Sequence, residues 1–291
     1  MRPLQNTTGV PAGLEACRDM KTRIITAAVL IPVLVIVLFI LPNWVFAWAL
    51  AIMLGIGAYE MLFRTGLVRH VRMVLYSAIA AFSIPLLCYY QASHGWTLFV
   101  VLVYVSLLFG ELMLSHTRVP FEKVAISAFA GLILPYALSA LIRILDGSFG
   151  EYLIATPFIL AFLPDSGAYF AGCFFGKHKL APVISPKKTW EGAAGGLLTG
   201  MICMVIYSMI LQLGFHFRVN YLYAIIYGLL GSLAAIFGDL CFSVVKRQTG
   251  IKDYGNLFPG HGGVLDRFDS MLFVCPLIEL LLDVIPVVVL L

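Results

Sequence analysis

The sequence predicts an all-helical, polytopic integral membrane protein, and three observations carry this prediction. Hydrophobic residues make up 61% of the 291 residues, against roughly 45–50% in soluble domains. Apolar runs long enough to cross a bilayer, which takes about 20 residues, recur along the chain. Basic residues gather in alternate gaps between these runs. We therefore expect residues 21–291 to form a single transmembrane domain.

Nine apolar runs qualify as spans, so we expect a bundle of about nine transmembrane helices. The runs lie near residues 24–41, 44–63, 73–91, 96–114, 124–145, 152–172, 193–213, 222–245 and 271–291. A tight turn at Pro42-Asn43 joins the first two. The long polar connections are residues 173–192 and 246–270, so these two segments are where chemistry is expected.

The first 20 residues are polar and lack periodicity, which is typical of a disordered tail. Met20 is followed by Lys21, Arg23 and then an apolar run, a pattern that resembles the start of a membrane protein, so Met20 is an alternative initiator. No small-x-small cleavage site precedes the second span. We therefore expect the first run to be a retained helix rather than a removed signal.

The basic residues orient the bundle. With the N-terminus in the cytoplasm, every lysine and arginine except Arg143 and Arg218 falls on the cytoplasmic side. This is the positive-inside asymmetry, and it predicts a cytoplasmic N-terminus, an external C-terminus and an odd number of spans. Both long polar loops then face the cytoplasm, where nucleotides and Mg²⁺ are found. We expect a multi-pass protein of the cytoplasmic (inner) membrane with its active site on that side.

Charge and cysteine content exclude other classes. The net charge of +4 is small and dispersed, so nucleic acid is not an expected partner. The six cysteines are scattered without any C-x-x-C pair. We therefore expect neither a disulfide framework nor a zinc site.

Acidic residues inside membrane spans are rare and are functional candidates by default. Glu60, Glu111, Asp165 and Asp239 fall in even-numbered spans, towards their cytoplasmic ends. For Glu60 and Glu111 the alternative is a bond to a loop cation near the interface, whereas Asp165 and Asp239 are the stronger site candidates. Glu279 and Asp283 lie four residues apart in the last span, and the sequence offers only helix packing or a buried hydrogen bond for them.

The stretch from Ser243 to Asp269, SVVKRQTGIKDYGNLFPGHGGVLDRFD, concentrates charge and glycine. Its cations suit a polyanion, its carboxylates suit a hard metal ion, and its glycines allow a backbone turn close to a ligand. Asp239, Ser243 and Lys246 are spaced i, i+4 and i+7, so they share one helix face with Arg247 beside it. This pattern indicates phosphate chemistry.

A second polar segment precedes the seventh span. Ser185 is a good N-cap and Pro186 a good first helical residue, so we expect a helix to begin there. Lys187 and Lys188 would then occupy its first turn, where the helix dipole disfavours cations and a bound phosphate would compensate. The alternative is that both lysines contact anionic lipid headgroups. Gly192, Gly196 and Gly200 recur every four residues, which predicts close packing of this helix on a neighbour.

These residues also carry a family resemblance. The spacing of Ser243, Lys246-Arg247, Lys252-Asp253, Gly255, Pro259-x-His261-Gly262-Gly263 and Asp266-Arg267-x-Asp269 is similar to the signature of phosphatidate cytidylyltransferases, also called CDP-diacylglycerol synthases. Upstream, PDSGAYFAG from Pro164 and GKHKLAPVISPKKTWEG from Gly176 resemble further elements of that family. Residues 1–150 resemble it only in being hydrophobic.

The resemblance implies an enzyme that condenses CTP with phosphatidate to CDP-diacylglycerol and pyrophosphate, with Mg²⁺ held by Asp239 and Asp266. It also implies a homodimer. The catalytic candidates are Asp239, Asp266, Lys246, Arg247, Lys252, Asp253, His261, Arg267 and Asp269. The candidates for binding substrate are Asp165, Ser185, Lys187, Lys188, Glu191, Ser243, Gly262 and Gly263.

Three questions stay open at this stage. A second ion, for which a monovalent cation is one option, is compatible with Asp165, Asp253 and Asp269. A membrane phosphotransferase acting on another lipid phosphate or a polyprenol would use the same ions. An ion-coupled transporter is the rival from a different class, because intramembrane carboxylates also form ion paths.

Overall fold

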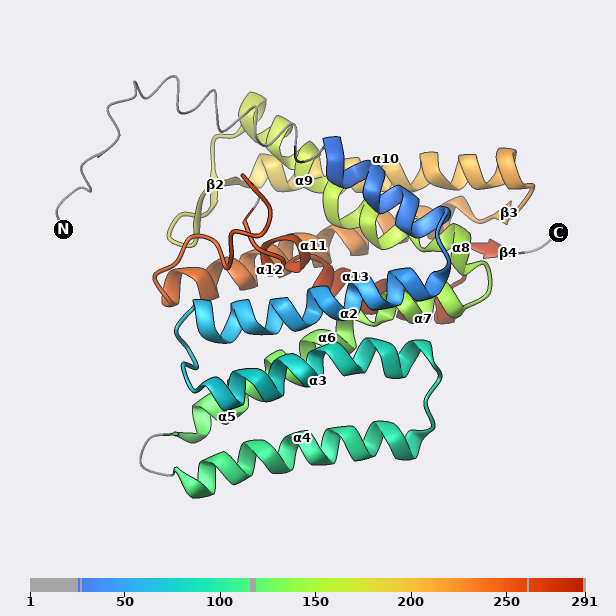
Figure 1. Ribbon diagram of the computed structural model, residues 1–291. Helices are drawn as coiled ribbons and strands as arrows, with labels where there is room; N and C mark the ends of the chain where they lie inside the picture. The colour runs from blue at the N-terminus through green and yellow to red at the C-terminus, as the bar shows by residue number, and fades with distance from the viewer. Residues whose placement is uncertain (1–25, 27, 116–118, 261, 290–291) are drawn as a thin grey trace.

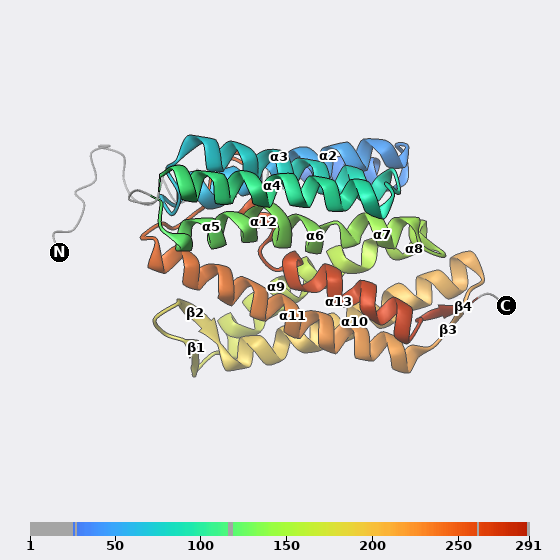
Figure 2. The ribbon, with the colours of Figure 1, turned by 90° about the horizontal axis from the view of Figure 1, so that it is seen from below.

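The computed structural model describes residues 26–289, apart from Ala27, residues 116–118 and His261. The predicted tail of residues 1–20 lies outside the described residues. Within them the chain is mainly helical, with the long helices running side by side along a common direction (Figures 1 and 2). The prediction of a helical bundle is confirmed.

Seven helical segments of the described chain are long and apolar enough to cross a membrane. They are Asn43–Arg64, Val71–Tyr89, His94–Leu114, Phe121–Asp146, Gly150–Phe175, Trp190–Phe215 and Tyr221–Gln248. Their helices are α2 (Asn43–Tyr59) with the π-helical turn η1 (Glu60–Arg64), α3 (Val71–Tyr89), α4 (His94–Leu114), α5 (Phe121–Ala128) with the π-helical turn η2 (Phe129–Ile133), α6 (Leu134–Leu138), α7 (Ala140–Asp146), α8 (Gly150–Leu153), α9 (Ala155–Phe175), α10 (Trp190–Phe215) and α11 (Tyr221–Gln248).

Among the described residues, the first and last predicted spans contain helices shorter than expected. The run 24–41 contains a described helix over Ala28–Phe39. The run 271–291 contains α13 (Met271–Val284), which follows the short helix α12 (Leu265–Phe268). Pro286 cannot continue a helix and pushes Ile285 out of helical geometry, so the chain leaves α13 as strand β4 (Val288–Val289). The prediction of a helix to residue 291 is wrong for this last part.

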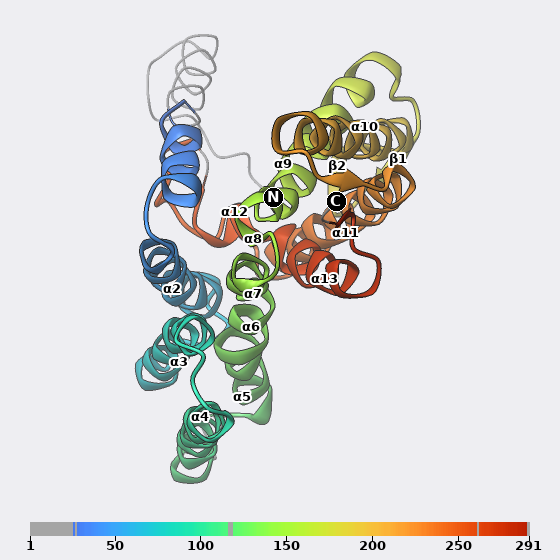
Figure 3. The ribbon, with the colours of Figure 1, turned by 90° about the vertical axis from the view of Figure 1, so that its right-hand side faces the viewer.

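Three groups of helices make up the bundle (Figure 3). The first is formed by α2, α3 and α4, which pack in sequence order. The second is α5 to α7, which lies against α3 on one side and against α13 on the other. The third contains α9, α10, α11 and α13. The C-terminal signature therefore sits where the first and third groups approach each other.

Glycines allow α10 to pack closely between α9 and α11, as predicted. A methyl group on Gly196 would lie 3.0 Å from the carbonyl oxygen of Pro164 in α9, and one on Gly192 would lie 2.8 Å from that of Ala168. Gly200 faces Ser232 and Gly228 of α11. These contacts hold α9, α10 and α11 together, and α9 and α11 carry Asp165 and Asp239.

The polar connections collect at one end of the bundle. The hairpin of β1 (Lys179–Ala181) and β2 (Ser185–Thr189), the turn after η1 and the loop between α11 and α12 lie together there (Figures 1 and 2). Strands β3 (Arg218–Val219) and β4 pair at the opposite end, where α7 also ends. The basic loops thus share one end, while Arg143 and Arg218 lie at the other.

Candidate active site

The segment around Ser185 is a strand rather than a helix start, which corrects the prediction made from Ser185-Pro186. Residues Ser185–Thr189 form β2, paired antiparallel with β1, and α10 begins only at Trp190. Thr189 is the N-cap, and its side-chain oxygen accepts the backbone N–H of Gly192 at 3.1 Å. The helix is therefore capped by Thr189, four positions after Ser185, and Lys187 and Lys188 lie in a strand.

Glu191 anchors this hairpin. Its carboxylate accepts the backbone N–H groups of Lys177 at 3.1 Å and of His178 at 3.2 Å. It also contacts His178 Nδ1 at 2.6 Å. Glu191 was predicted to bind substrate, and its contacts are those of a residue that fixes the base of the hairpin.

A cavity of about 430 Å³ lies between the hairpin, α9, α10 and α11. Two carboxylates and three lysines of its wall meet there: Asp165, Asp239, Lys179, Lys187 and Lys188. The Lys188 ammonium group forms an ion pair with Asp239, although the two residues are far apart in sequence. The structure therefore joins the hairpin to α11, the helix that leads into the second polar segment.

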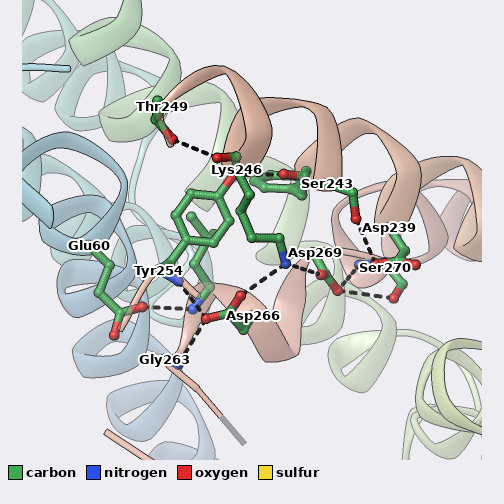
Figure 4. Close-up of polar contacts among 12 residues, drawn as sticks. Glu60, Asp239, Ser243, Lys246, Thr249, Tyr254, Gly263, Asp266, Asp269 and Ser270 are labelled. Atoms are coloured by element: carbon green, nitrogen blue, oxygen red, sulfur yellow. Dashed lines mark hydrogen bonds and ion pairs between the residues drawn. The ribbon is translucent and has the colours of Figure 1, made fainter. Parts of the chain in front are cut away.

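The face of α11 predicted to carry phosphate chemistry points at the C-terminal signature (Figure 4). Ser243 Oγ donates to Asp239 Oδ1 at 3.5 Å, one turn earlier on α11. One turn later, Lys246 Nζ lies 3.0 Å from Asp266 Oδ1 and 3.6 Å from Asp269 Oδ2. The shared helix face is confirmed, and it connects the cavity to a second, more buried group of charges.

Asp266 organises the loop that precedes it. Its Oδ2 atom accepts the backbone N–H of Tyr254 at 2.7 Å and that of Gly263 at 3.0 Å. The intervening turn is closed by a hydrogen bond from Phe258 N–H to Gly262 O at 2.9 Å, with Gly260 at φ +74° and Gly262 at φ +86°. Gly262 and Gly263 thus serve the fold around Asp266, and their predicted contact with substrate stays a prediction.

Asp269 and Arg267 complete the buried cluster. Burial raises the pKa of Asp269 to about 6, and the nearby charge of Asp239 adds to the rise. Arg267 lies within electrostatic reach of Asp269, and its Nε atom is buried without a hydrogen-bond partner. A buried guanidinium nitrogen without a hydrogen-bond partner suits an anionic ligand.

Other predicted residues lie outside these contacts. Arg247 Nε donates to Ile184 O at 3.1 Å, which ties α11 to the hairpin. Lys252 and Asp253 are exposed in the loop after α11. His261 lies outside the described residues.

Two residues that the structure places at the site were not among the predicted site residues. Tyr254 is fully buried, its ring lies 5.4 Å from Lys246 Nζ, and its hydroxyl donates to Phe242 O at 3.2 Å. Glu60 accepts the backbone N–H of Leu265 at 2.9 Å. The signal for Tyr254 was an aromatic residue in a loop otherwise rich in glycine and charge. Glu60 was marked as a buried carboxylate, and the structure shows that its partner is a backbone amide rather than a loop cation.

Glu111 and Glu279 each pair with an arginine. Glu111 pairs at 3.2 Å with Arg72, so its partner is a cation as in the predicted alternative, but one in the first turn of α3 rather than in a loop. Glu279 binds Arg143 through two contacts, at 2.5 Å to Nε and 2.7 Å to Nη2. Asp283 lines a cavity of about 370 Å³ beside this pair. These groups lie away from the cavity that holds Lys188 and Asp239.

The carboxylates of Asp239 and Asp266 can supply some of the oxygen ligands that a hard divalent cation needs. Among the described residues, no three histidine, cysteine or acidic side chains are gathered closely enough to enclose a metal ion on their own. Asp239 and Asp266 offer oxygen donors, and each already holds a lysine ammonium group. Mg²⁺ is usually held by one or two carboxylates together with water and substrate phosphates, so two carboxylates match the number of protein ligands it needs.

Comparison with known proteins extends the likeness over nearly the whole chain. The sequence pattern of the cytidylyltransferase family matches residues 21–285. The chain is 32% identical over 274 residues to the phosphatidate cytidylyltransferase of Bacillus subtilis, a match covering 91% of this chain and 98% of that protein. It is 35% identical over 276 residues to that of Pseudomonas aeruginosa, covering 90% and 97%. The Staphylococcus aureus protein of the same name is 47% identical over 133 residues, covering 46% and 50%.

Proposed function

Because the chain belongs to the cytidylyltransferase family, we propose that it is a membrane nucleotidyltransferase that condenses CTP with phosphatidate to give CDP-diacylglycerol and pyrophosphate. This places it in phospholipid biosynthesis. The observation that carries the proposal is the ion pair between Lys188 and Asp239. It lies in a polar cavity lined by both upstream segments that resemble the family and by α11, one turn before the signature begins at Ser243.

The chemistry requires positioning and charge neutralisation more than proton transfer. A phosphate oxygen of phosphatidate forms a bond to the α-phosphorus of CTP, and the bond from that phosphorus to the oxygen bridging the α- and β-phosphates breaks, so that this oxygen leaves with pyrophosphate. A phosphate monoester is already ionised at neutral pH, so the nucleophile needs little help from a base. Preorganised cations that meet the developing negative charge supply the main stabilisation.

The cations fall into two sets. Lys187 and Lys188 reach the cavity from the hairpin, and we assign them to the substrate phosphates. Lys246 and Arg267 lie with the buried carboxylates, where they balance the charge of Asp266 and Asp269. Lys252 and Arg247 extend the basic surface around the site.

Mg²⁺ is the cofactor we propose, with Asp239 and Asp266 as its protein ligands. When bound, it would neutralise charge on the nucleotide phosphates. A lysine already lies on each of these carboxylates, so the site stabilises positive charge at both. Asp165 and Asp269, each within electrostatic reach of Asp239, are further carboxylates for a second ion.

We also propose the finer topology. The helices Ala28–Phe39 and α13 would complete nine spans with the seven long helices, with the N-terminus in the cytoplasm and the C-terminus outside. The gathering of basic loops at one end supports this orientation. The active site would then face the cytoplasm from the inner membrane, and a homodimer remains part of the proposal.

A transfer assay tests the function. Purified protein in mixed micelles receives CTP labelled at the α-phosphate with either phosphatidate or a polyprenyl phosphate, and label entering lipid is counted. We expect Mg²⁺-dependent labelling with phosphatidate and release of one pyrophosphate per lipid labelled. Labelling only with the polyprenyl phosphate, or none with either lipid, would refute the assignment.

A further inference from the structure

Glu60 is a buried acidic residue that the proposed reaction does not use. It begins the π-helical turn after α2, and only 4% of its surface is exposed. Its Oε2 atom accepts the backbone N–H of Leu265, a residue 205 positions away that opens α12. Most intramembrane carboxylates pair with another charged side chain or face a water-filled cavity, whereas Glu60 hydrogen-bonds to the backbone of a distant loop, with the charges of Arg64 and Asp266 nearby. Its role must therefore be sought in the loop it contacts.

The loop is shaped around the Glu60 carboxyl group. A Cβ atom added to Gly255 or to Gly263 would lie 2.6 Å from the Glu60 carboxyl carbon, closer than real side chains approach. A side chain at either position would therefore force the Glu60 carboxylate to move. Leu265, Gly255 and Gly263 thus contact one side chain at three points of the signature.

Each of these points is tied to Asp266. Leu265 immediately precedes it, and Gly263 donates its backbone N–H to Asp266 Oδ2 at 3.0 Å. Gly255 follows Tyr254, whose N–H donates to the same oxygen at 2.7 Å. Figure 4 shows Glu60 and Lys246 approaching Asp266 and its loop from opposite sides. A displacement of Glu60 would therefore be transmitted to the Asp266 carboxylate through the backbone.

The backbone at both ends of this contact also fits a role for Glu60 in holding the loop. Leu265 is the first residue of α12, and the first N–H groups of a helix lack partners within it. Glu60 supplies that partner from a distant helix. The widened turn over Glu60–Arg64 is of a kind that often occurs at functional sites.

We propose that Glu60 is a positioning residue that holds the 254–266 loop so that Asp266 points into the active site. It acts through the reach of its carboxylate to Leu265 N–H and does not touch substrate. The inference rests on the proposed function, because Asp266 is there a ligand for Mg²⁺.

Two conservative substitutions of Glu60 separate the effect of its side-chain length from the effect of its charge. Glu60→Gln keeps the length of the side chain and an acceptor oxygen but removes the charge. Glu60→Asp keeps the charge but is one methylene shorter, so it cannot contact Leu265 from the same backbone. Glu111→Asp is the matched control, since Glu111 is also 4% exposed but pairs with Arg72 away from the loop.

The test combines hydrogen exchange, metal binding and kinetics on the full-length protein. In Glu60→Asp we expect amides of residues 254–268 to exchange at least tenfold faster, with the other helices unchanged. We expect Mn²⁺, which suits the same oxygen ligands and is detected by electron paramagnetic resonance, to bind about tenfold more weakly. We expect kcat to fall roughly 100-fold with little change in KM for CTP, as for a misplaced group. Glu60→Gln should stay within a few-fold of wild type in all three.

Two outcomes would overturn the inference. The first is an unchanged exchange rate in residues 254–268 of Glu60→Asp, or the same change in Glu111→Asp. The second is the reverse order, with Glu60→Asp active and Glu60→Gln inactive, which would mean that charge matters and reach does not. Exchange is measured without substrates, so failure of the proposed reaction would show in turnover alone.

Discussion

Replacing Lys188 by alanine is the most direct test of the site, because Lys188 is the residue that joins its two halves. The side chains of Lys188 and Asp239 are each 24% exposed, and they form an ion pair at the wall of the cavity. Lys188→Ala removes a cation from the proposed phosphate site. It also leaves Asp239 without this partner. Both effects can be measured separately.

The structure sets the expected magnitude. A fully exposed ion pair contributes about 0–1 kcal/mol, whereas a charge-assisted hydrogen bond in a sheltered site contributes about 1.5–3 kcal/mol. Lys188 is three-quarters covered, so the second range applies to its contact with a substrate phosphate. Since 1.36 kcal/mol corresponds to a factor of ten, kcat/KM for CTP should fall roughly 10–150-fold. Lys188→Arg should restore only part of it, because the guanidinium fork does not replace a point charge.

Steady-state kinetics with both substrates below saturation measure this loss. Lys177→Ala is the control, because Lys177 is exposed on the same hairpin and does not line the cavity. We also expect half-maximal activity of Lys188→Ala at a lower Mg²⁺ concentration, because the lysine no longer competes for Asp239. Wild-type kcat/KM in Lys188→Ala, or an equal loss in Lys177→Ala, would refute the assignment of Lys188 to substrate.

Three further predictions follow from the same structure. Asp239→Asn and Asp266→Asn should each abolish lipid labelling while the protein still elutes as a folded species in size-exclusion chromatography; near-normal labelling by either variant would remove it from the proposed metal site. In a Cys173→Ser background, a cysteine at Val183 should react with an impermeant maleimide only from the cytoplasmic side and one at Ser148 only from outside, and the opposite pattern would invert the proposed topology. Glu279→Gln should leave Arg143 unpaired and destabilise the protein by an amount near the lower end of about 3–5 kcal/mol, seen as a lower melting temperature in detergent, with partial recovery in Arg143→Glu/Glu279→Arg.

The bundle was predictable because membrane insertion leaves few options for the backbone. An apolar run of about 20 residues must become a helix in lipid, and seven of the predicted runs did so without reference to tertiary contacts. The ends of the chain were less predictable. At residues 285–289, Pro286 and the pairing of β4 with β3 decide the conformation, and β3 is about 70 residues away in sequence.

The candidate site was predictable where one helix carries it. The i, i+4, i+7 spacing of Asp239, Ser243 and Lys246 fixes a shared face through helix geometry alone, and the structure confirms it. Glu60 could be marked as a buried carboxylate but not assigned, because its partner is a backbone N–H more than 200 residues away. No side-chain pattern encodes such a contact.

The error at Ser185 has a different origin, and it changes how the two lysines should be regarded. Ser185 and Thr189 can both cap a helix. Contacts outside the segment decide in favour of Thr189: β2 pairs with β1, and Glu191 accepts the backbone N–H groups of Lys177 and His178. As part of a helix turn, Lys187 and Lys188 would be nearly equivalent. Both lysines line the cavity, but Lys188 forms the ion pair with Asp239 whereas Lys187 is exposed, so in a strand the two are not equivalent. Lys187→Ala should therefore lower kcat/KM less than Lys188→Ala does, and equal losses would indicate that both lysines contact substrate equally.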